Sequence, residues 1–316
     1  MANINKTIKN IKALKIQGAS NICRASIAAW RDYLLGFKTK NVKKYLSEAK
    51  NVGARLALAR PNEPLTVNAF KYLNQRLRVE TRFISSKQKQ MVLDIPSLKK
   101  LTRQYVQDFS SLLHQNGARI SVEGAKLIKS KQNIFTHCHS RTVENIFIQA
   151  QSQKKKFHVY NDETRPMFQG RITSQKMAEH KILNTMVVDS AATFIVSDHS
   201  GDDIKIHQVF LGFDVILPDG SALNKIGSFG ITLTANESNI PVYLCGTILK
   251  SVKNKKMKIE LRREAEVWPK APKGLEIINY AFDRIPARFI TGYVTEFGIL
   301  KPGDIGKYLR KYYEWI

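Results

Sequence analysis

Apolar residues in the first third of the chain recur with the period of a helix. Between residues 19 and 35 they fall every three or four positions, as one buried helical stripe requires. The same period returns at 42–56, 67–77 and 98–112, with no convincing strand between these stretches. The pattern therefore predicts a helical N-terminal domain over residues 1–128.

The pattern changes after Ser130, where short apolar runs alternate with segments of helical length. The runs lie at 134–135, 159–160, 186–188, 209–211 and 242–244. This alternation is typical of βαβ units and predicts an α/β domain with a parallel sheet over residues 129–316. Open α/β sheets bind ligands outside the carboxyl ends of their strands, so we expect the chemistry in this second half.

The chain is strongly basic. Lys and Arg total 51 against 26 for Asp and Glu, which gives a formal net charge of +25 and attracts phosphates of any kind. Short clusters at 154–156 and 253–258 are typical of solvated surface, and contact with nucleic acid or a membrane stays open as the alternative. Nucleic acid is not an expected partner, because no aromatic-basic interleaving or groove-reading motif accompanies the charge.

The cysteines and the apolar runs indicate the compartment. Cys23, Cys138 and Cys245 lie too far apart for a CxxC or zinc spacing, and an odd number argues against a disulfide framework. No apolar signal-like segment opens the chain, and no run approaches 18 apolar residues. We therefore expect a cytoplasmic protein without a membrane span.

A first polar cluster, THCHS at 136–140, follows an expected strand and precedes an expected helix. Near a helix N-terminus, and between imidazoles, the pKa of Cys138 should fall below its reference of about 8.5. The alternative is a buried, inert cysteine, since free Cys is among the most commonly buried residues.

A second cluster at 162–166, completed by Gln169 and Gly170, follows the next strand. The planar guanidinium of Arg165 suits a phosphate or carboxylate. The alternative is an ordinary loop with a surface salt bridge.

A third cluster covers residues 211–230, in which Asp214 ends a strand. Asn224 and Lys225 precede an apolar helix, and Lys225 with the following amides could hold a phosphate at the helix N-terminus. Asp219 and Gly220 are typical of a plain turn. Two N-terminal segments, 17–20 and 59–62, could reach a ligand across a cleft or simply cap and connect helices.

Taken together and in order, these segments resemble the family that joins ribose-1,5-bisphosphate isomerase, methylthioribose-1-phosphate isomerase and the regulatory subunits of translation initiation factor 2B. The motifs span nearly the whole chain: THCHS at 136–140, ETRPMFQG at 163–170, VVDSAA at 187–192, DGSALNKIG at 219–227, NYAFDRIP at 279–286 and TEFG at 295–298. The resemblance implies a helical N-terminal domain followed by a Rossmann-like domain, in agreement with the periodicity.

The chain departs from the family pattern at several positions. His139 follows the cysteine where methylthioribose-1-phosphate isomerases typically carry Asn, which argues against a methylthioribose substrate. The other departures are Gln17 for Arg, Arg141 for Ser or Thr, Phe213 for Ala, Ser228 for Thr and Tyr280 for Pro.

The resemblance implies conversion of ribose 1,5-bisphosphate to ribulose 1,5-bisphosphate without a redox cofactor or metal. Its catalytic cysteine and aspartate fall on Cys138, as base, and Asp214, as acid. The substrate-binding residues it implies are Gly18, Ala19, Ser20, Arg60, His139, Ser140, Arg165, Gln169, Asn224 and Lys225.

Further expectations rest on the resemblance alone: a role in nucleotide salvage, AMP as an activator, and a homo-oligomer, either a dimer or a hexamer. Three alternative functions remain open: a non-catalytic regulatory subunit that binds a nucleotide or sugar phosphate, a methylthioribose-1-phosphate isomerase, and a non-specific nucleic-acid binder. Retention of both Cys138 and Asp214 argues against the regulatory subunit, which needs neither group.

Overall fold

The computed structural model describes residues 2–87, 94–200, 204–253 and 257–316. The chain divides into two compact units, the first comprising 1–115, 249–251 and 311–316, and the second 116–248 and 252–310. The boundary that we predicted after residue 128 falls at the end of α5, a helix that contributes to both units. Part of the lysine cluster at 253–258, residues 254–256, lies outside the described residues.

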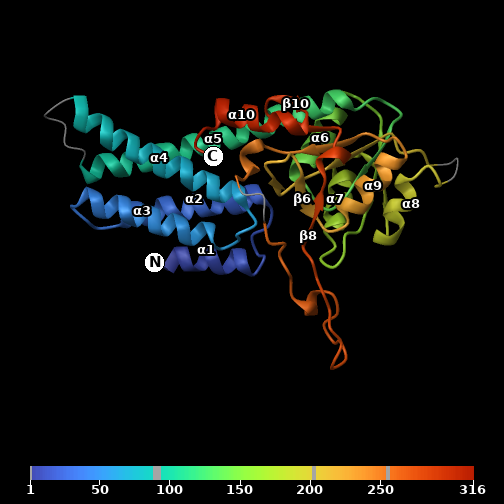
Figure 1. The fold of residues 1–316 in the computed structure, drawn as a ribbon, viewed down its shortest axis with the longest axis horizontal. Helices are drawn as coiled ribbons and strands as arrows, with labels where there is room; N and C mark the ends of the chain where they lie inside the picture. Colours follow the sequence, from blue (N-terminus) through green and yellow to red (C-terminus); the bar gives the residue numbers. More distant parts are fainter. Residues whose placement is uncertain (1, 88–93, 201–203, 254–256) are drawn as a thin grey trace. The chain divides into compact units, whose positions relative to one another are not determined.

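The first unit consists of helices (Figure 1). They are α1 (Ala2–Lys12), α2 (Ala19–Gly36), α3 (Val42–Ala57), α4 (Pro64–Lys87) and the first part of α5 (Ile95–Leu127). The periodic stretches of the sequence lie in α2 to α5, and the indole of Trp30 donates a hydrogen bond to the carbonyl of Ala49 at 2.7 Å, which ties α2 to α3. We did not expect α1, in which Ile4 and Ile11 are buried.

The second unit contains a mostly parallel sheet with the order β10-β9-β7-β4-β1-β2-β3. Its strands are β1 (Asn133–Thr136), β2 (His158–Asp162), β3 (Leu183–Val187), β4 (Gln208–Leu211), β7 (Val242–Cys245), β9 (Gly292–Thr295) and β10 (Gly298–Leu300). All neighbours pair in parallel except β10 with β9. The predicted runs lie in β1 to β4 and β7, whereas β9 and β10 were not predicted.

Helices connect the strands of this sheet. They are α6 (Arg141–Ser152), α7 (Gln169–Glu179), α8 (Ala192–Val196) and α9 (Ser228–Glu237), with α10 (Ile305–Tyr312) following the last strand. A buried core joins the end of α5 and the apolar face of α6 to the strands, with Phe147 at 6.0 Å from Phe210 between ring centroids. This packing holds the N-terminus of α6 at the carboxyl end of β1.

The strand order of the sheet defines where a ligand should bind. Numbered along the chain, the parallel strands β1, β2, β3, β4, β7 and β9 lie in the order 3-2-1-4-5-6, which is that of dinucleotide-binding folds. The order reverses between β1 and β4, and ligands of such folds bind outside the carboxyl ends at this switch point. Cys138 follows β1 and Asp214 follows β4.

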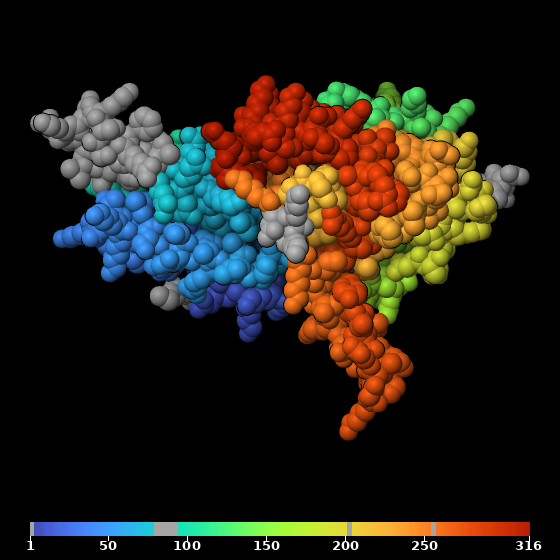
Figure 2. Space-filling model, viewed as in Figure 1, coloured from blue at the N-terminus to red at the C-terminus, as the bar shows by residue number. Residues whose placement is uncertain are grey.

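A second, antiparallel sheet has the order β5-β6-β8, from β5 (Val215–Ile216), β6 (Ala222–Lys225) and β8 (Phe282–Ile285). It brings Lys225, at the end of β6, opposite Phe282 on β8. Residues 257–280, before β8, leave the sheets and form an extended arm, drawn in orange in Figure 1 and Figure 2. Within this arm Leu261 pairs with Tyr280.

Candidate active site

Cys138 lies in the short loop between β1 and α6, in a left-handed backbone conformation with φ of 65°. Hydroxyl groups hold both of its backbone polar groups. Its N–H donates to Oγ1 of Thr164 at 3.0 Å, and its carbonyl accepts from Oγ1 of Thr173 at 2.8 Å. The side chain is only partly buried, whereas those of Cys23 and Cys245 are fully buried.

The expected lowering of the Cys138 pKa is not found. Burial raises the pKa of this thiol to about 11, and the negative charges of Asp214 and Asp162 raise it as well, while the positive charge of Lys225 lowers it. The prediction failed because the desolvation of the thiol outweighs the cations and dipoles that favour a thiolate. The thiol is therefore almost entirely protonated at neutral pH.

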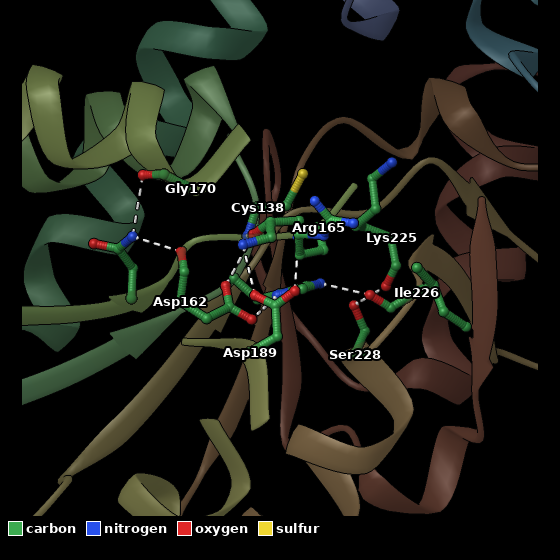
Figure 3. Close-up of polar contacts among 12 residues, drawn as sticks. Cys138, Asp162, Arg165, Gly170, Asp189, Lys225, Ile226 and Ser228 are labelled. Atoms are coloured by element: carbon green, nitrogen blue, oxygen red, sulfur yellow. Dashed lines mark hydrogen bonds and ion pairs between the residues drawn. The ribbon is translucent and has the colours of Figure 1, made fainter. Parts of the chain in front are cut away.

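Asp214, directly before β5, and Lys225, at the end of β6, lie near enough to this cysteine for their charges to act on its thiol. Asp214 is half-buried, and its N–H donates to the carbonyl of Leu223 at 2.9 Å, which fixes the chain directly before β5. The charges of Asp214 and Lys225 both act on the Cys138 thiol. In Figure 3 the sulfur of Cys138 and the amine of Lys225 point to the same side of the cluster, away from Asp189 and Ser228.

Phe213, which precedes the aspartate, does not enter the site. Its side chain is buried, and its ring meets that of Tyr293 edge-on with 5.4 Å between the centroids. A Cβ atom at Gly246 would lie 2.8 Å from this ring, so the glycine supplies the room that the larger side chain needs. The departure from the usual Ala is therefore absorbed in the core.

Ser140 and His139 lie at the start of α6. Ser140 caps this helix by accepting the N–H of Val143 at 3.5 Å. It also packs against the loop that leads to Asp214, because a Cβ atom at Gly212 would lie 2.8 Å from its Oγ. Nδ1 of His139 lies 3.4 Å from Oγ1 of Thr173, and burial together with nearby cations lowers its pKa. His139 is therefore neutral at neutral pH.

The loop after β2 is held by a carboxylate. Asp189 accepts the N–H groups of Thr164 at 2.7 Å and Arg165 at 2.6 Å. The guanidinium of Arg165 donates to the carbonyl of Val267 on the arm at 2.9 Å and lies over the ring of Phe168. The predicted phosphate ligand thus contacts a protein carbonyl in this structure.

Gln169 opens α7, and its side chain is an open polar group. Its Oε1 is buried and has no hydrogen-bond partner among the residues that the structure describes. Since a buried, unpaired amide oxygen costs about 1–3 kcal/mol, such a group is typical of a site that a ligand completes.

The N-terminus of α9 does not offer the phosphate site that we predicted after Lys225. Oδ2 of Asp283 accepts the N–H of Gly227 at 2.7 Å and of Phe229 at 3.0 Å, so a carboxylate already occupies the position of an anion. Burial raises the pKa of Asp283 in spite of these hydrogen bonds. Asn224 is also engaged, donating from Nδ2 to Oγ of Ser228 at 2.8 Å. Only the side chain of Lys225 remains as the predicted phosphate ligand of this segment.

A buried histidine–aspartate pair lies beneath the cysteine loop, and the sequence did not single it out. Nδ1 of His137 lies 2.6 Å from Oδ2 of Asp162, and both side chains are almost fully buried. Nε2 of His137 lies 2.9 Å from the carbonyl oxygen of Ile226. Burial lowers the pKa of His137, but the hydrogen bond and charge of Asp162 outweigh it, so the pKa is raised.

A cavity of about 410 Å³ lies beside this pair, and both side chains form part of its wall. Arg165 and Asp189 contribute polar groups to its wall, and Ile226, Ile231 and Val267 contribute apolar ones. Cys138, Asp214 and Lys225 are not among its lining residues, so the cavity is separate from the groups that surround the thiol.

The remaining predicted residues belong to the first unit. Gly18 is the N-cap of α2 with φ of 81° and makes no side-chain cap, while Ala19 and Ser20 form the first turn of this helix. Arg60 lies 3.5 Å from the carboxylate of Glu63. These groups are a helix N-terminus and a cation, and their role in substrate binding stays a prediction.

Within the described ranges, no group of three or more His, Cys, Asp or Glu side chains is arranged to hold a metal ion. Among the same residues, no helix combines the length and apolarity that a membrane crossing needs.

Comparisons with known proteins agree with the fold and the motifs. Over 319 residues the chain is 29% identical to the ribose 1,5-bisphosphate isomerase of Methanocaldococcus jannaschii, with coverage of 99% of this chain and 96% of the relative. It is 30% identical to the methylthioribose-1-phosphate isomerase of Pelotomaculum thermopropionicum, with coverage of 92% and 81%.

Solved structures show the same fold. Translation initiation factor eIF-2B of Pyrococcus horikoshii OT3 superposes with a TM-score of 0.76 at 20% identity, covering 95% of this chain and 97% of that one. The 5-methylthioribose 1-phosphate isomerase of the same organism gives 0.75 at 23% identity, covering 98% and 87%. The model of the initiation factor 2 subunit family matches residues 15–302, and the chain belongs to this family.

Proposed function

We propose that the protein is a sugar-phosphate isomerase that converts ribose 1,5-bisphosphate to ribulose 1,5-bisphosphate. The observation that best supports the proposal is that Cys138 and Asp214 follow the two strands of the switch point, β1 and β4, and that the charges of Asp214 and Lys225 act on the Cys138 thiol. A thiol, a carboxyl and a cation there are suited to moving a proton on an anionic sugar. Relatives named ribose 1,5-bisphosphate isomerase, which align over nearly the whole chain, support the choice of substrate.

In the first step of the proposed reaction, the thiolate of Cys138 removes the proton from C2 of the ring form. The electron pair of the C–H bond forms the C1–C2 double bond as the bond between C1 and the ring oxygen breaks. The carboxyl of Asp214 gives its proton to the leaving ring oxygen. The product of this step is an open-chain enol that still carries both phosphates.

In the second step, the thiol returns its proton to C1 while the hydroxyl on C2 loses a proton to the Asp214 carboxylate. The result is a ketone at C2, and both catalytic groups regain their starting forms. Lys225 stabilises the thiolate and the negative charge that develops on the C2 oxygen. The proton that leaves C2 is the one delivered to C1, so the thiol must hold it without exchange with water.

Phosphate binding at the reacting end is assigned to groups of the second unit. The groups proposed for this role are Lys225, His139 and Ser140 at the start of α6, and Gln169, whose amide oxygen is buried and unpaired among the described residues. On the family resemblance alone, Arg60 and the α2 N-terminus at residues 18–20 are assigned to the second phosphate. AMP activation and oligomer formation are proposed on the same resemblance. Arg165 joins the phosphate ligands only if it leaves the Val267 carbonyl.

The direct test is to incubate the purified protein with ribose 1,5-bisphosphate and to measure ribulose 1,5-bisphosphate. Wild type should turn over, Cys138→Ser should lose at least about a thousandfold in kcat, and the buried Cys245→Ala should stay within about threefold. Methylthioribose 1-phosphate in the same assay should react much more slowly. Binding of ribose 1,5-bisphosphate without turnover would instead favour the regulatory alternative, and preference for methylthioribose 1-phosphate would refute the substrate.

A further inference from the structure

A continuous chain of hydrogen bonds runs from the backbone of Cys138 into the interior of the second unit. The N–H of Cys138 donates to Oγ1 of Thr164, which in turn donates to Oδ1 of Asp162 at 2.9 Å. Oδ2 of the same carboxylate meets His137, whose other nitrogen meets the carbonyl of Ile226. Ile226 follows Lys225 directly, so the chain joins the loop of the thiol to the loop of the cation.

The direction of each bond in this chain is determined. The carbonyl of Ile226 can only accept, so Nε2 of His137 carries a proton. A carboxylate can only accept, so Thr164 donates to Asp162 and its oxygen is left to accept from Cys138. A proton must also lie between Nδ1 of His137 and Asp162, because two lone pairs at 2.6 Å would repel. The chain therefore has one consistent arrangement.

The arrangement acts on a strained residue. Cys138 and Thr164 both have positive φ, 65° and 59°, a region that costs non-glycine residues of order 1 kcal/mol or more. Thr173 holds the carbonyl of Cys138 from the other side at 2.8 Å. Thr164 and Asp162 are almost completely buried, and a hydrogen bond in such surroundings is stronger than one in water.

We propose that Thr164 and Thr173 are positioning residues that clamp the backbone of Cys138, with Thr164 anchored by the Asp162–His137 pair. The clamp fixes the direction of the thiol relative to Lys225 and keeps it in its partly buried environment. Neither threonine touches the reacting atoms. The catalytic part of this inference rests on the proposed isomerase function, whereas the state of the thiol can be measured without it.

The test compares Thr164→Val and Thr173→Val, which remove one hydroxyl each, with Thr164→Ser and Thr173→Ser, which restore it. Thr295→Val is the matched control. Thr295 is fully buried at the end of β9, where its hydroxyl donates to the carbonyl of Gly298 and accepts the N–H of Phe297. It therefore loses the same pair of bonds without contacting the cysteine loop.

We expect kcat on ribose 1,5-bisphosphate to fall about 10- to 100-fold in each Val variant, with KM within about threefold, since misplacing a reacting group by about 1 Å can cost a hundredfold. The Ser variants and Thr295→Val should stay within about threefold of wild type. Alkylation of Cys138 by iodoacetamide, followed by mass spectrometry of its peptide, should be about five- to tenfold faster in the Val variants. The reason is that a released loop lets the thiol pKa return toward its reference.

The outcomes separate the two proposals. Faster alkylation in the Val variants, with no turnover even by wild type, would refute the isomerase function and keep the clamp. Wild-type kcat and wild-type alkylation in Thr164→Val and Thr173→Val would refute the clamp. If a Val variant fails to fold, its Ser partner and the other threonine decide the question, and an equal loss in Thr295→Val would reduce the effect to general destabilisation and overturn the proposal.

Discussion

The reactivity of Cys138 tests the electrostatics of the site most directly, and Lys225→Met is the perturbation to apply. With a pKa of about 11, about one thiol in a thousand is ionised at pH 8. An unperturbed cysteine of pKa about 8.5 is about one quarter ionised. Cys138 therefore has about 240-fold less thiolate than an unperturbed cysteine at this pH. Each of its thiolates is about 20-fold more nucleophilic, for a Brønsted coefficient near 0.5, which offsets part of this loss. Cys138 should therefore be alkylated about tenfold more slowly than a free cysteine.

Removal of the Lys225 charge should raise the pKa of Cys138 further, because that charge is the largest influence that lowers it. If the pKa of Cys138 rises by about one unit, the thiolate fraction at a given pH falls tenfold, while the nucleophilicity of each thiolate gains about threefold. The alkylation rate should thus fall about threefold. Asp214→Asn should change the rate about threefold in the opposite direction, since the Asp214 charge raises the pKa.

The assay is the pseudo-first-order rate of iodoacetamide addition at pH 8, followed on the Cys138 peptide by mass spectrometry. Cys23 and Cys245 are fully buried with raised pKa values and serve as internal references that should not react. Lys301→Met, at an exposed position after the edge strand β10, is the control for loss of a lysine. A Cys138 rate equal to that of a free cysteine, or no difference between Lys225→Met and Lys301→Met, would refute the reasoning.

Three further outcomes follow from the geometry. Below the thiol pKa of about 11 the Cys138 thiolate fraction rises tenfold per pH unit, so the rate of iodoacetamide addition to Cys138 should increase with a slope near one between pH 7 and 9; a plateau in that range would show that the thiol is already ionised. The raised pKa of His137 contributes stability that is fully present below pH 6.5 and is lost as the pH rises through the pKa of the folded state. In urea unfolding, the difference in unfolding free energy between wild type and Asp162→Asn should therefore shrink above pH 6.5, and growth of this difference would contradict the assignment. Gly212→Ala places a Cβ atom 2.8 Å from Oγ of Ser140 and should lower the free energy of unfolding by about 1–3 kcal/mol, which thermal denaturation would measure; an unchanged Tm would show that the two loops are not in close contact.

The parallel strands could be predicted because strands covered on both faces are short continuous apolar runs. Once strands were assigned, the carboxyl-end rule indicated that the chemistry follows them, and the family resemblance paired Cys138 with Asp214, which the structure has after β1 and β4. Strand β9 was harder to find, since its small and polar positions, Gly292 and Thr295, break the apolar run. Helix α1 was missed because its apolar residues are separated by polar ones on every side.

The details of the site depend on contacts between distant segments, which a local pattern does not contain. Asp283 caps α9 from 56 and 54 positions away, and this partner removed the phosphate site that the Gly227 segment had suggested. His137 was read as a neighbour that would favour the thiolate, yet its ring is committed to Asp162. A histidine next to a cysteine in sequence need not face it in space.

The raised pKa of the Cys138 thiol affects both proton transfers of the proposed reaction. At pH 8 the loss of thiolate, about 240-fold, exceeds the gain in basicity, about 20-fold, so burial slows the first proton transfer. The same pKa makes the thiol a weaker acid in the second step, so the return of the proton to C1 is not accelerated. What a raised pKa favours is retention, because a thiol that holds its proton tightly loses it to solvent more slowly before C1 is protonated. The cost to the first step is reduced by a nearby cation, and Lys225 is the side chain with that effect on Cys138.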